Sequence, residues 1–254
     1  MKKKCKALLA GALSLMMLTA CGASSSSTAA PASSSGSAGS STAAASDTAW
    51  PEDVQEIVDR GVLRVGVKNA VPGFGYQDPL TGEYSGMEID LANKIADYLG
   101  VETEFTTVTA ATRGELLDSG DIDCVLATFT ITDERKQTWD FTTPYYTDAV
   151  TVLVEDSSGI TSLADLVGKT VGVSSGSTSA RELVRAMVEK GLVSGDNFDP
   201  DTFDPTTWTE GVSFHQYDDY PTISTALSAG EVDAFCVDRS ILAIYKTEGR
   251  SYIQ

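Results

Sequence analysis

The 254-residue chain contains one histidine, His215, and only four cysteines. A single histidine and cysteines without metal-ligand spacing cannot supply the usual ligand sets of zinc, so we expect no metal site and no cofactor. Cys124 and Cys236 lie in apolar patterns and are predicted to be small buried residues. The apolar stretch 7–18 is shorter than the roughly 20 residues that a membrane-spanning helix requires.

Positive charge is also scarce, because 18 lysines and arginines face 36 aspartates and glutamates. The net charge of −18 becomes −22 once the four lysines of an expected signal segment are removed. Such a chain cannot easily form a basic face, so we expect no nucleic-acid partner. A lysine or arginine at a strand end is then a candidate for binding an acidic ligand. The sequence shows no base–nucleophile pair, so we expect no catalytic residues.

The N-terminus has the features of a signal segment. Lys2, Lys3, Lys4 and Lys6 precede the short apolar stretch 7–18, and Leu18-Thr19-Ala20-Cys21 is similar to a bacterial lipobox. We therefore expect a lipoprotein signal peptide over 1–21, with Cys21 as the lipidated residue. The alternative is an ordinary secretory signal with a chance cysteine. Residues 22–49 are almost entirely Ser, Ala, Thr and Gly, a composition typical of a disordered tether.

The rest of the chain alternates between strand and helix patterns, which predicts an α/β fold with mainly parallel sheets. Strands are predicted at 63–67, 104–108, 122–127, 149–154, 170–173, 212–215 and 234–237. Helices are predicted at 89–99, 113–118, 179–190, 222–229 and 239–245.

One strand-to-helix junction carries two hydroxyl groups and a guanidinium group. Thr128 and Thr130 follow the strand 122–127 and are expected to point the same way, and Thr132 is expected to cap a helix that carries Arg135. A guanidinium fork suits a carboxylate, and the carboxyl ends of strands are where open α/β sheets bind small molecules. The alternative is that Arg135 is a solvated surface charge.

Two other strand ends have suitable polar groups. The segment 174–179 follows a strand and opens a helix, so its amide groups could bind an anion, with Gly176 allowing close approach. Asp238 ends the strand 234–237, where its carboxylate could pair with an ammonium group. Each has a structural alternative, since serines and aspartates are also common helix caps.

Several segments in order resemble the bacterial extracellular solute-binding proteins that serve polar amino acid ABC transporters. They are Val62–Lys68, Asp78–Gly82, Gly86–Ala92, Ala127–Arg135, Asp140–Tyr146 and Gly168–Val173. The resemblance implies a two-lobed, type II periplasmic-binding-protein-like fold. Lobe 1 would span 50–148, and the crossover and lobe 2 would span 149–254. It also implies a C-terminal return segment to lobe 1, which this sequence does not contain.

The resemblance assigns roles to residues in a cleft between the lobes. Arg135 and the amides around Gly176, Ser177 and Thr178 would share the α-carboxylate, and Asp238 would bind the α-amino group. Residues 66–72 and 112–117 look like the aspartate/glutamate branch, in which Lys68 and Arg113 would bind a side-chain carboxylate. Phe74 or Tyr76 would pack on the aliphatic stem, and Tyr220 would add a hydroxyl. Core packing is the alternative for these aromatic residues.

We therefore expect a monomeric receptor, anchored by lipid at the extracytoplasmic face of the cell membrane. It would capture glutamate or aspartate and present it to an ABC permease. One alternative is a receptor for glutamine or another polar amino acid. Another is a cyclohexadienyl or arogenate dehydratase on the same fold. The sequence does not identify the preferred amino acid, the permease or the role of the acidic insert 196–204.

Overall fold

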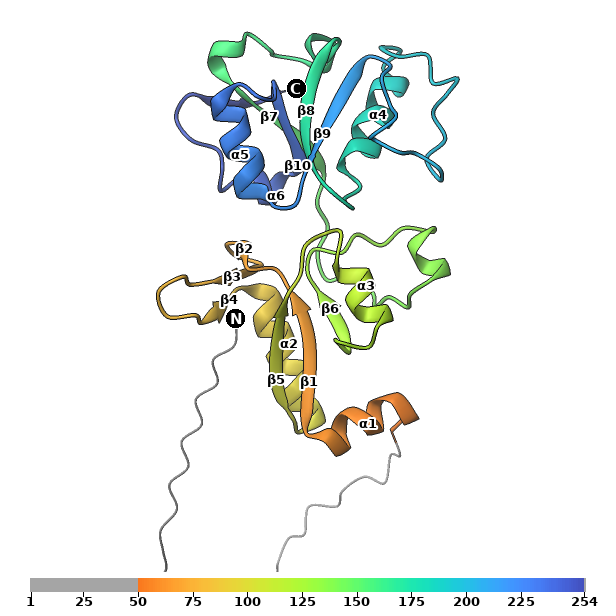
Figure 1. Cartoon of the computed structure of the whole chain (residues 1–254), viewed down its shortest axis with the longest axis vertical. Helices are drawn as coiled ribbons and strands as arrows, with labels where there is room; N and C mark the ends of the chain where they lie inside the picture. Colours follow the sequence, from red (N-terminus) through yellow and green to blue (C-terminus); the bar gives the residue numbers. More distant parts are fainter. Residues whose placement is uncertain (1–49, 254) are drawn as a thin grey trace, which may run out of the picture. The chain divides into compact units, whose positions relative to one another are not determined.

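Strands and helices alternate through residues 50–253, the part of the chain that the computed structural model describes (Figure 1). The expected signal peptide 1–21 with Cys21, and the expected tether 22–49, lie outside these residues. We use lobe 1 for residues 50–148, which hold a three-stranded parallel sheet, and lobe 2 for residues 149–253, which hold a five-stranded sheet. The predicted α/β fold is confirmed.

The parallel sheet of lobe 1 has the strand order β5-β1-β6. Its strands are β1 (Val62–Val67), β5 (Glu102–Thr107) and β6 (Cys124–Leu126). Its helices are α1 (Glu52–Arg60), α2 (Met87–Leu99) and α3 (Arg113–Asp118). The apolar side chains of α2 pack on β1 with Leu63, Val65 and Val67, while Val108, Ile122 and Ala127 form a second cluster with α3. Because these clusters cover the sheet with helices, the ends of its strands are left for binding.

A small antiparallel sheet in lobe 1 was not expected from the sequence. It consists of β2 (Ala70–Val71), β3 (Gly75–Gln77) and β4 (Tyr84–Ser85). Two glycines permit its tight path. A Cβ on Gly75 would lie 2.5 Å from the Lys68 carbonyl oxygen, and one on Gly86, at φ +124°, would lie 2.2 Å from the Phe74 carbonyl oxygen. This packing holds the segment after Lys68 against the start of α2.

Lobe 2 contains a sheet with the order β11-β7-β10-β8-β9. Its strands are β7 (Val150–Glu155), β8 (Lys169–Ser174), β9 (Val212–Tyr217), β10 (Ala234–Asp238) and β11 (Arg250–Tyr252). Figure 1 shows α4 (Ser179–Glu189) on one side, and α5 (Tyr220–Ala229) and α6 (Arg239–Leu242) on the other. Two separate apolar clusters match this arrangement. β8, β9 and β10 are parallel, whereas β7 and β11 run antiparallel to their neighbours.

The expected helix at Arg135 is a single 3-10 turn, η1 (Arg135–Gln137), so the α-helical expectation was wrong there. Thr132 nevertheless caps it, because the Thr132 hydroxyl accepts a hydrogen bond from the Arg135 amide at 3.1 Å. Two further 3-10 turns are η2 (Asp156–Ser158) and η3 (Leu163–Leu166). The helix expected at 239–245 ends at Leu242.

The acidic insert 196–204 is held by aromatic packing. Phe198, Phe203 and Trp208 contact one another with ring centroids 5.6–6.1 Å apart, and Phe203 also meets Phe214 of β9. Among residues 50–253, no group of three His, Cys, Asp or Glu side chains is placed to hold a metal ion. The insert therefore packs as an extension of the lobe 2 core.

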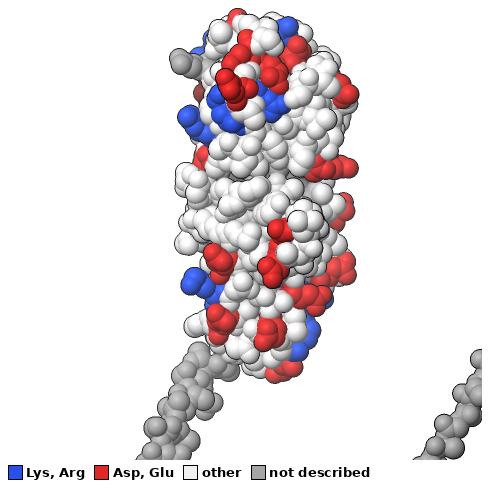
Figure 2. Space-filling model, turned by 90° about the vertical axis from the view of Figure 1, so that its left-hand side faces the viewer, with Lys and Arg blue, Asp and Glu red and all other residues white. Residues whose placement is uncertain are grey.

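Acidic side chains outnumber basic ones on the face shown in Figure 2, and its middle is largely uncharged. None of the helices in the described part of the chain has the length and apolar character needed to cross a bilayer.

Candidate functional site

Several contacts join lobe 1 to lobe 2 around the strand ends. Arg135 donates from Nη2 to the Gly176 carbonyl oxygen at 3.0 Å, and Glu134 pairs with Arg181 of α4 at 3.3 Å. Val71 of β2 packs in the apolar cluster of α5 and α6. The Lys68 ammonium group lies 5.5 Å from the centre of the Tyr220 ring. These contacts place the predicted site residues at the junction of the lobes.

Gly176 brings the backbone of lobe 2 close to that of lobe 1. A Cβ at this position would lie 2.7 Å from Ala111 Cα and 2.8 Å from the Ala110 carbonyl oxygen. Gly176 also has φ +72°, in the left-handed region that glycine adopts most easily. Gly176 was predicted to let a ligand approach the backbone closely. In this structure, the group that approaches it closely is the backbone of lobe 1 at Ala110 and Ala111.

The two threonines after β6 are not a matched pair. β6 ends at Leu126, and Thr128 has φ +49°, so side chains do not alternate as they would along a strand. The expectation that Thr128 and Thr130 point the same way was therefore wrong. The Thr128 hydroxyl is buried without a hydrogen-bond partner, whereas Thr130 is exposed and its carbonyl oxygen accepts a bond from Arg135 at 2.8 Å.

Arg113 stabilises this turn from inside lobe 1. Its side chain is 3% exposed, and Nη1 donates to the carbonyl oxygens of Ala127 and Thr128 at 2.7 and 3.0 Å. Its guanidinium carbon lies 4.0 Å from the centre of the Phe129 ring, and Nε has no partner. Burial lowers the pKa of Arg113 to about 10, so it stays charged at neutral pH. Arg113 thus uses Nη1 on the backbone, while its Nε is buried without a partner.

Arg135 shares the ring of Phe129, with its guanidinium carbon 4.6 Å from the ring centre. Its two hydrogen-bond partners are the carbonyl oxygens of Thr130 and Gly176. Burial, followed by the neighbouring charges of Arg113 and Arg181, lowers its pKa to about 10. Arg135 is therefore a half-buried cation at the lobe junction whose hydrogen bonds go only to neutral acceptors.

The turn before α4 is partly occupied by its own hydrogen bonds. The Ser177 amide donates to the Ser174 carbonyl oxygen at 3.1 Å, and the Ser177 hydroxyl lies 3.4 Å from the Ser179 amide. Thr178 is the residue before the helix, and its side chain makes no capping bond. The Thr178 side chain therefore does not cap α4, and the Ser177 amide is already bonded within the turn.

Asp238 occupies the cap position of α6, but its side chain accepts no bond from the helix. Asp148, from the segment before β7, takes this role by accepting from the amide of Ser240 at 2.9 Å and from its hydroxyl. Burial and the nearby charge of Asp148 raise the pKa of Asp238. The capping alternative for Asp238 was therefore wrong, and its carboxylate is left for another partner.

Glu88 is a charged group of this region that sequence reasoning missed. It lies in the first turn of α2 with no exposed surface, and its Oε1 accepts from the Thr128 amide at 2.6 Å and the Tyr145 hydroxyl at 2.7 Å. Its Oε2 has no partner. Burial raises the pKa of Glu88, while these hydrogen bonds and the charges of Lys68 and Arg113 oppose that rise.

Lys68 and Tyr220 are both buried at the junction, at 5% and 5% exposure. Burial first, and then the charge of Arg113, lowers the pKa of Lys68 to about 7. Tyr220 begins α5, and burial raises its pKa to about 12. The solvated alternative for Lys68 was wrong, because the β2–β4 segment and lobe 2 enclose it.

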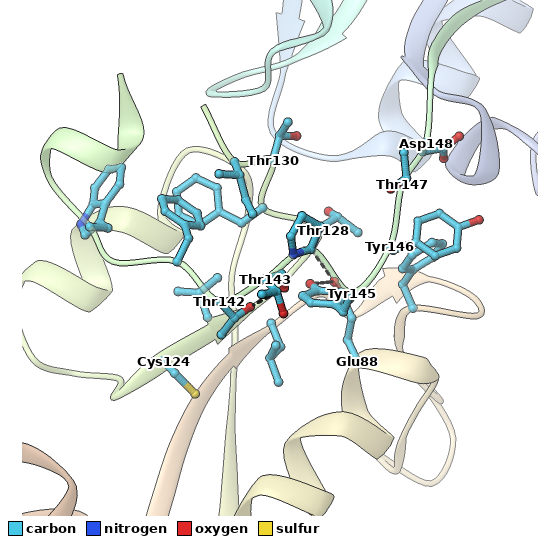
Figure 3. A pocket seen from close by; sticks show the side chains of 18 of the residues that line it. Glu88, Cys124, Thr128, Thr130, Thr142, Thr143, Tyr145, Tyr146, Thr147 and Asp148 are labelled. Carbon is cyan, nitrogen blue, oxygen red and sulfur yellow. Dashed lines mark hydrogen bonds between the residues drawn. The ribbon is translucent and has the colours of Figure 1, made fainter. Parts of the chain in front are cut away.

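A cavity of about 470 Å³ opens beside these residues (Figure 3). Its wall includes Glu88, Thr128, Thr130 and Asp238, together with Phe74, whose ring meets Tyr146 edge-on at 5.0 Å. It continues past Thr142 and Thr143 to Cys124, along the edge of β6 that β1 does not cover. The cavity and the predicted site overlap only in part, since Lys68, Arg113 and Arg135 do not line it.

Residues 63–197 match the model of the family described as bacterial extracellular solute-binding proteins, family 3. This match starts in β1 and ends in the acidic insert.

Two relatives are similar in sequence to most of this chain. The glutamine-binding protein of Geobacillus stearothermophilus is 34% identical over 77% of this chain and 68% of its own. The ABC transporter glutamine-binding protein GlnH of Bacillus subtilis is 31% identical over 99% of this chain and 80% of its own. Among solved structures, an ancestral arginine-binding protein bound to arginine matches with a TM-score of 0.62 and 33% identity, covering 76% of this chain and 79% of that chain.

Proposed function

The chain belongs to the bacterial extracellular solute-binding proteins of family 3, and we propose that it binds one amino acid between its lobes and delivers it to an ABC permease. The observation that carries this proposal is the placement of two unmatched charges at the lobe junction. Arg135 has only neutral acceptors, and the Asp238 carboxylate is not used to cap α6.

These two charges suit the common part of every α-amino acid. The α-carboxylate would bind Arg135 and the N-terminus of α4 at Thr178, displacing the Gly176 carbonyl from the guanidinium group. The α-ammonium group would pair with Asp238. Because the cation lies on lobe 1 and the carboxylate on lobe 2, a bound amino acid would link the lobes and favour their approach.

For the ligand side chain, we propose a carboxylate, as in glutamate or aspartate. Lys68 and Arg113 are buried cations near the junction, and Glu88 is the one buried anion that acts on both. With all three ionised, they carry a single positive charge, which one side-chain carboxylate would neutralise. An uncompensated charge is costly in a closed site, so an anionic ligand group would be favoured.

A glutamine ligand is the second candidate, and one observation favours it. Glu88 Oε2 is a buried acceptor without a donor, and Arg113 Nε is a buried donor without an acceptor. A carboxamide offers both a donor and an acceptor, so it could satisfy both kinds of group. The two relatives named above are called glutamine-binding proteins.

The remaining parts of the proposal concern location and assembly. The named relatives are transport binding proteins, which favours a receptor over an enzyme. We propose a monomer that a lipid on Cys21 anchors at the extracytoplasmic face of the membrane.

A thermal-shift screen of the twenty amino acids, followed by competition titration, tests the proposal. We expect acidic amino acids to stabilise the protein most, with discrimination over amides on the order of 10²-fold. If glutamine displaces glutamate at equal concentration, the acidic assignment is wrong and the amino acid receptor remains. If no amino acid shifts the melting temperature, the receptor proposal itself is wrong.

A further inference from the structure

Lys68 is a buried lysine whose amine has no acceptor among residues 50–253. Its side chain follows β1, is covered by lobe 2, and makes neither a hydrogen bond nor an ion pair with any other residue of the described chain. The face of the Tyr220 ring offers an ammonium group some attraction but no hydrogen-bond acceptor. Burying an ammonium group without an acceptor is unfavourable, so the ligand-free site disfavours the protonated form.

The charged neighbours of Lys68 come from every element around it. Arg113 from α3 repels a second positive charge, Glu88 from α2 attracts it, and Tyr220 from α5 is neutral at physiological pH because its pKa is raised. Asp238 at the end of β10 acts on Arg113. Burial and Arg113 together outweigh Glu88, and this balance brings the pKa of Lys68 to about 7.

We propose that Lys68 takes up a proton from solvent when glutamate or aspartate binds, an inference that rests on the acidic ligand proposed above. The proton adds to the lone pair of Nζ, and no bond of the ligand is formed or broken. The ligand carboxylate then supplies the acceptor and the negative charge that the empty site does not provide for an ammonium group. Capture of an acidic amino acid is thereby coupled to pH.

An amide ligand lacks this coupling. A glutamine side chain is neutral, so it supplies no charge that would hold the proton on Lys68. Arg113 cannot replace Lys68 in this role, because its pKa of about 10 keeps it charged with or without ligand. The pH response of binding therefore depends on the charge of the ligand side chain.

The coupling has a measurable size. Above the pKa of the ligand-free lysine, glutamate affinity falls by up to about tenfold per pH unit, because each binding event takes up one proton. Glutamine shares the α-amino and α-carboxyl groups of glutamate, so its affinity reports any pH effect that does not come from the side chain.

The test is isothermal titration calorimetry with glutamate and with glutamine, from about pH 6 to about pH 9. Each titration is run in two buffers that differ in ionisation enthalpy, because proton uptake then changes the observed heat. The full chain is compared with Lys68→Arg, whose guanidinium group stays charged. We expect proton uptake with glutamate alone, and its loss in Lys68→Arg.

Three results would overturn or separate the claims. Glutamate binding with the same heat in both buffers refutes proton uptake and leaves the receptor proposal intact, even if Lys68→Arg does not fold. Uptake that persists in Lys68→Arg but disappears in Glu88→Gln assigns the proton to Glu88 instead. Failure of glutamate, glutamine and every other amino acid to bind refutes the proposed function itself.

Discussion

Arg135 and Phe129 show how one aromatic ring can position a binding cation. The guanidinium groups of both Arg113 and Arg135 lie within 4.6 Å of the Phe129 ring centre, so the ring offsets part of the cost of holding two cations close together. Arg113 uses its N–H groups on the backbone, which leaves Arg135 to face lobe 2. The Phe129 ring thus contacts both guanidinium groups and also lines the cavity.

Replacing Arg135 with alanine should abolish measurable amino acid binding. The change leaves an α-carboxylate without its charged partner in a closed site, which costs about 2–5 kcal/mol. Isothermal titration calorimetry measures the loss. Arg185→Ala is a suitable control, because Arg185 lies on α4 and pairs only with Glu182 on its own helix. A loss of affinity below about threefold would remove Arg135 from the site.

The pKa of Lys68 also predicts how stability depends on pH. The folded pKa is about 7 and the usual value is 10.5, so the unfolded chain binds more protons between these values. The free energy of unfolding of the ligand-free protein should therefore rise with pH across this window relative to Lys68→Met. Urea denaturation of both proteins at several pH values measures it. A stability difference that stays constant with pH would show that Lys68 is charged in the folded protein.

At the scale of elements, the site is built where segments end. β6 stops at Leu126, Thr128 turns the chain at positive φ, and Glu88 at the start of α2 holds the Thr128 amide and the Tyr145 hydroxyl (Figure 3). Opposite them, β8 ends in the Gly176 turn before α4. Since these ends meet at the lobe junction, small changes in one turn should alter binding more than folding.

Gly176→Ala should weaken amino acid binding by keeping the lobes apart. The new Cβ would lie 2.7 Å from Ala111 Cα. Neither atom can move away by a side-chain rotation, so the backbone itself would have to shift. Gly191→Ala is the matched control. Gly191, just after α4, has a similar φ of +69° but no atom within 4 Å of an added Cβ.

Both variants should lose similar stability, on the order of 1 kcal/mol, because both force alanine into a left-handed conformation. Only Gly176→Ala should lose ligand affinity as well. Thermal unfolding and calorimetry on the two variants separate these effects. Equal affinity in both would mean that the contact between Gly176 and Ala111 is not part of the ligand-bound state.

At the scale of the whole molecule, two lobes with separate cores share one junction. The apolar clusters of lobe 1 and of α4 do not cross it, whereas Val71 joins the cluster of α5 and α6. Polar contacts such as Glu134–Arg181 complete the junction, and half-exposed ion pairs of this kind contribute little free energy. A ligand that links the lobes could therefore shift their equilibrium with modest binding energy.

Cys21→Ser should release the protein from the membrane fraction without changing ligand affinity. The expected lipid would be attached to Cys21, and residues 22–49 have the composition of a tether that separates it from the folded lobes. Fractionation in a bacterium that processes lipoproteins, followed by immunoblotting, measures the release. Cys5→Ser is the control, because Cys5 precedes the expected cleavage site. Membrane retention of the Cys21→Ser protein would refute the lipid anchor.

Local patterns were enough to locate most helices and strands. The helix 113–118 and the strands β7, β8, β9 and β10 were predicted within a few residues, because apolar spacing is a local property of the chain, whereas the three-residue β11 was missed. Arg135, Asp238 and the turn at Gly176 were proposed as site residues because polar residues at strand ends stand out from apolar strands. The small sheet β2–β4 was missed, since its strands have only two or three residues each.

The sequence by itself determined the alternation of strands and helices, the family, and the residues that end the strands. Only the tertiary structure decided which of those residues are enclosed and what they face. Glu88 looks like an ordinary acidic residue in the first turn of a helix, and Asp148 like a loop residue. Folding brings Glu88 near Lys68 and Arg113, and lets Asp148 cap α6 in place of Asp238. Charge balance and pKa depend on distances between residues far apart in the chain, and those distances exist only in the folded protein.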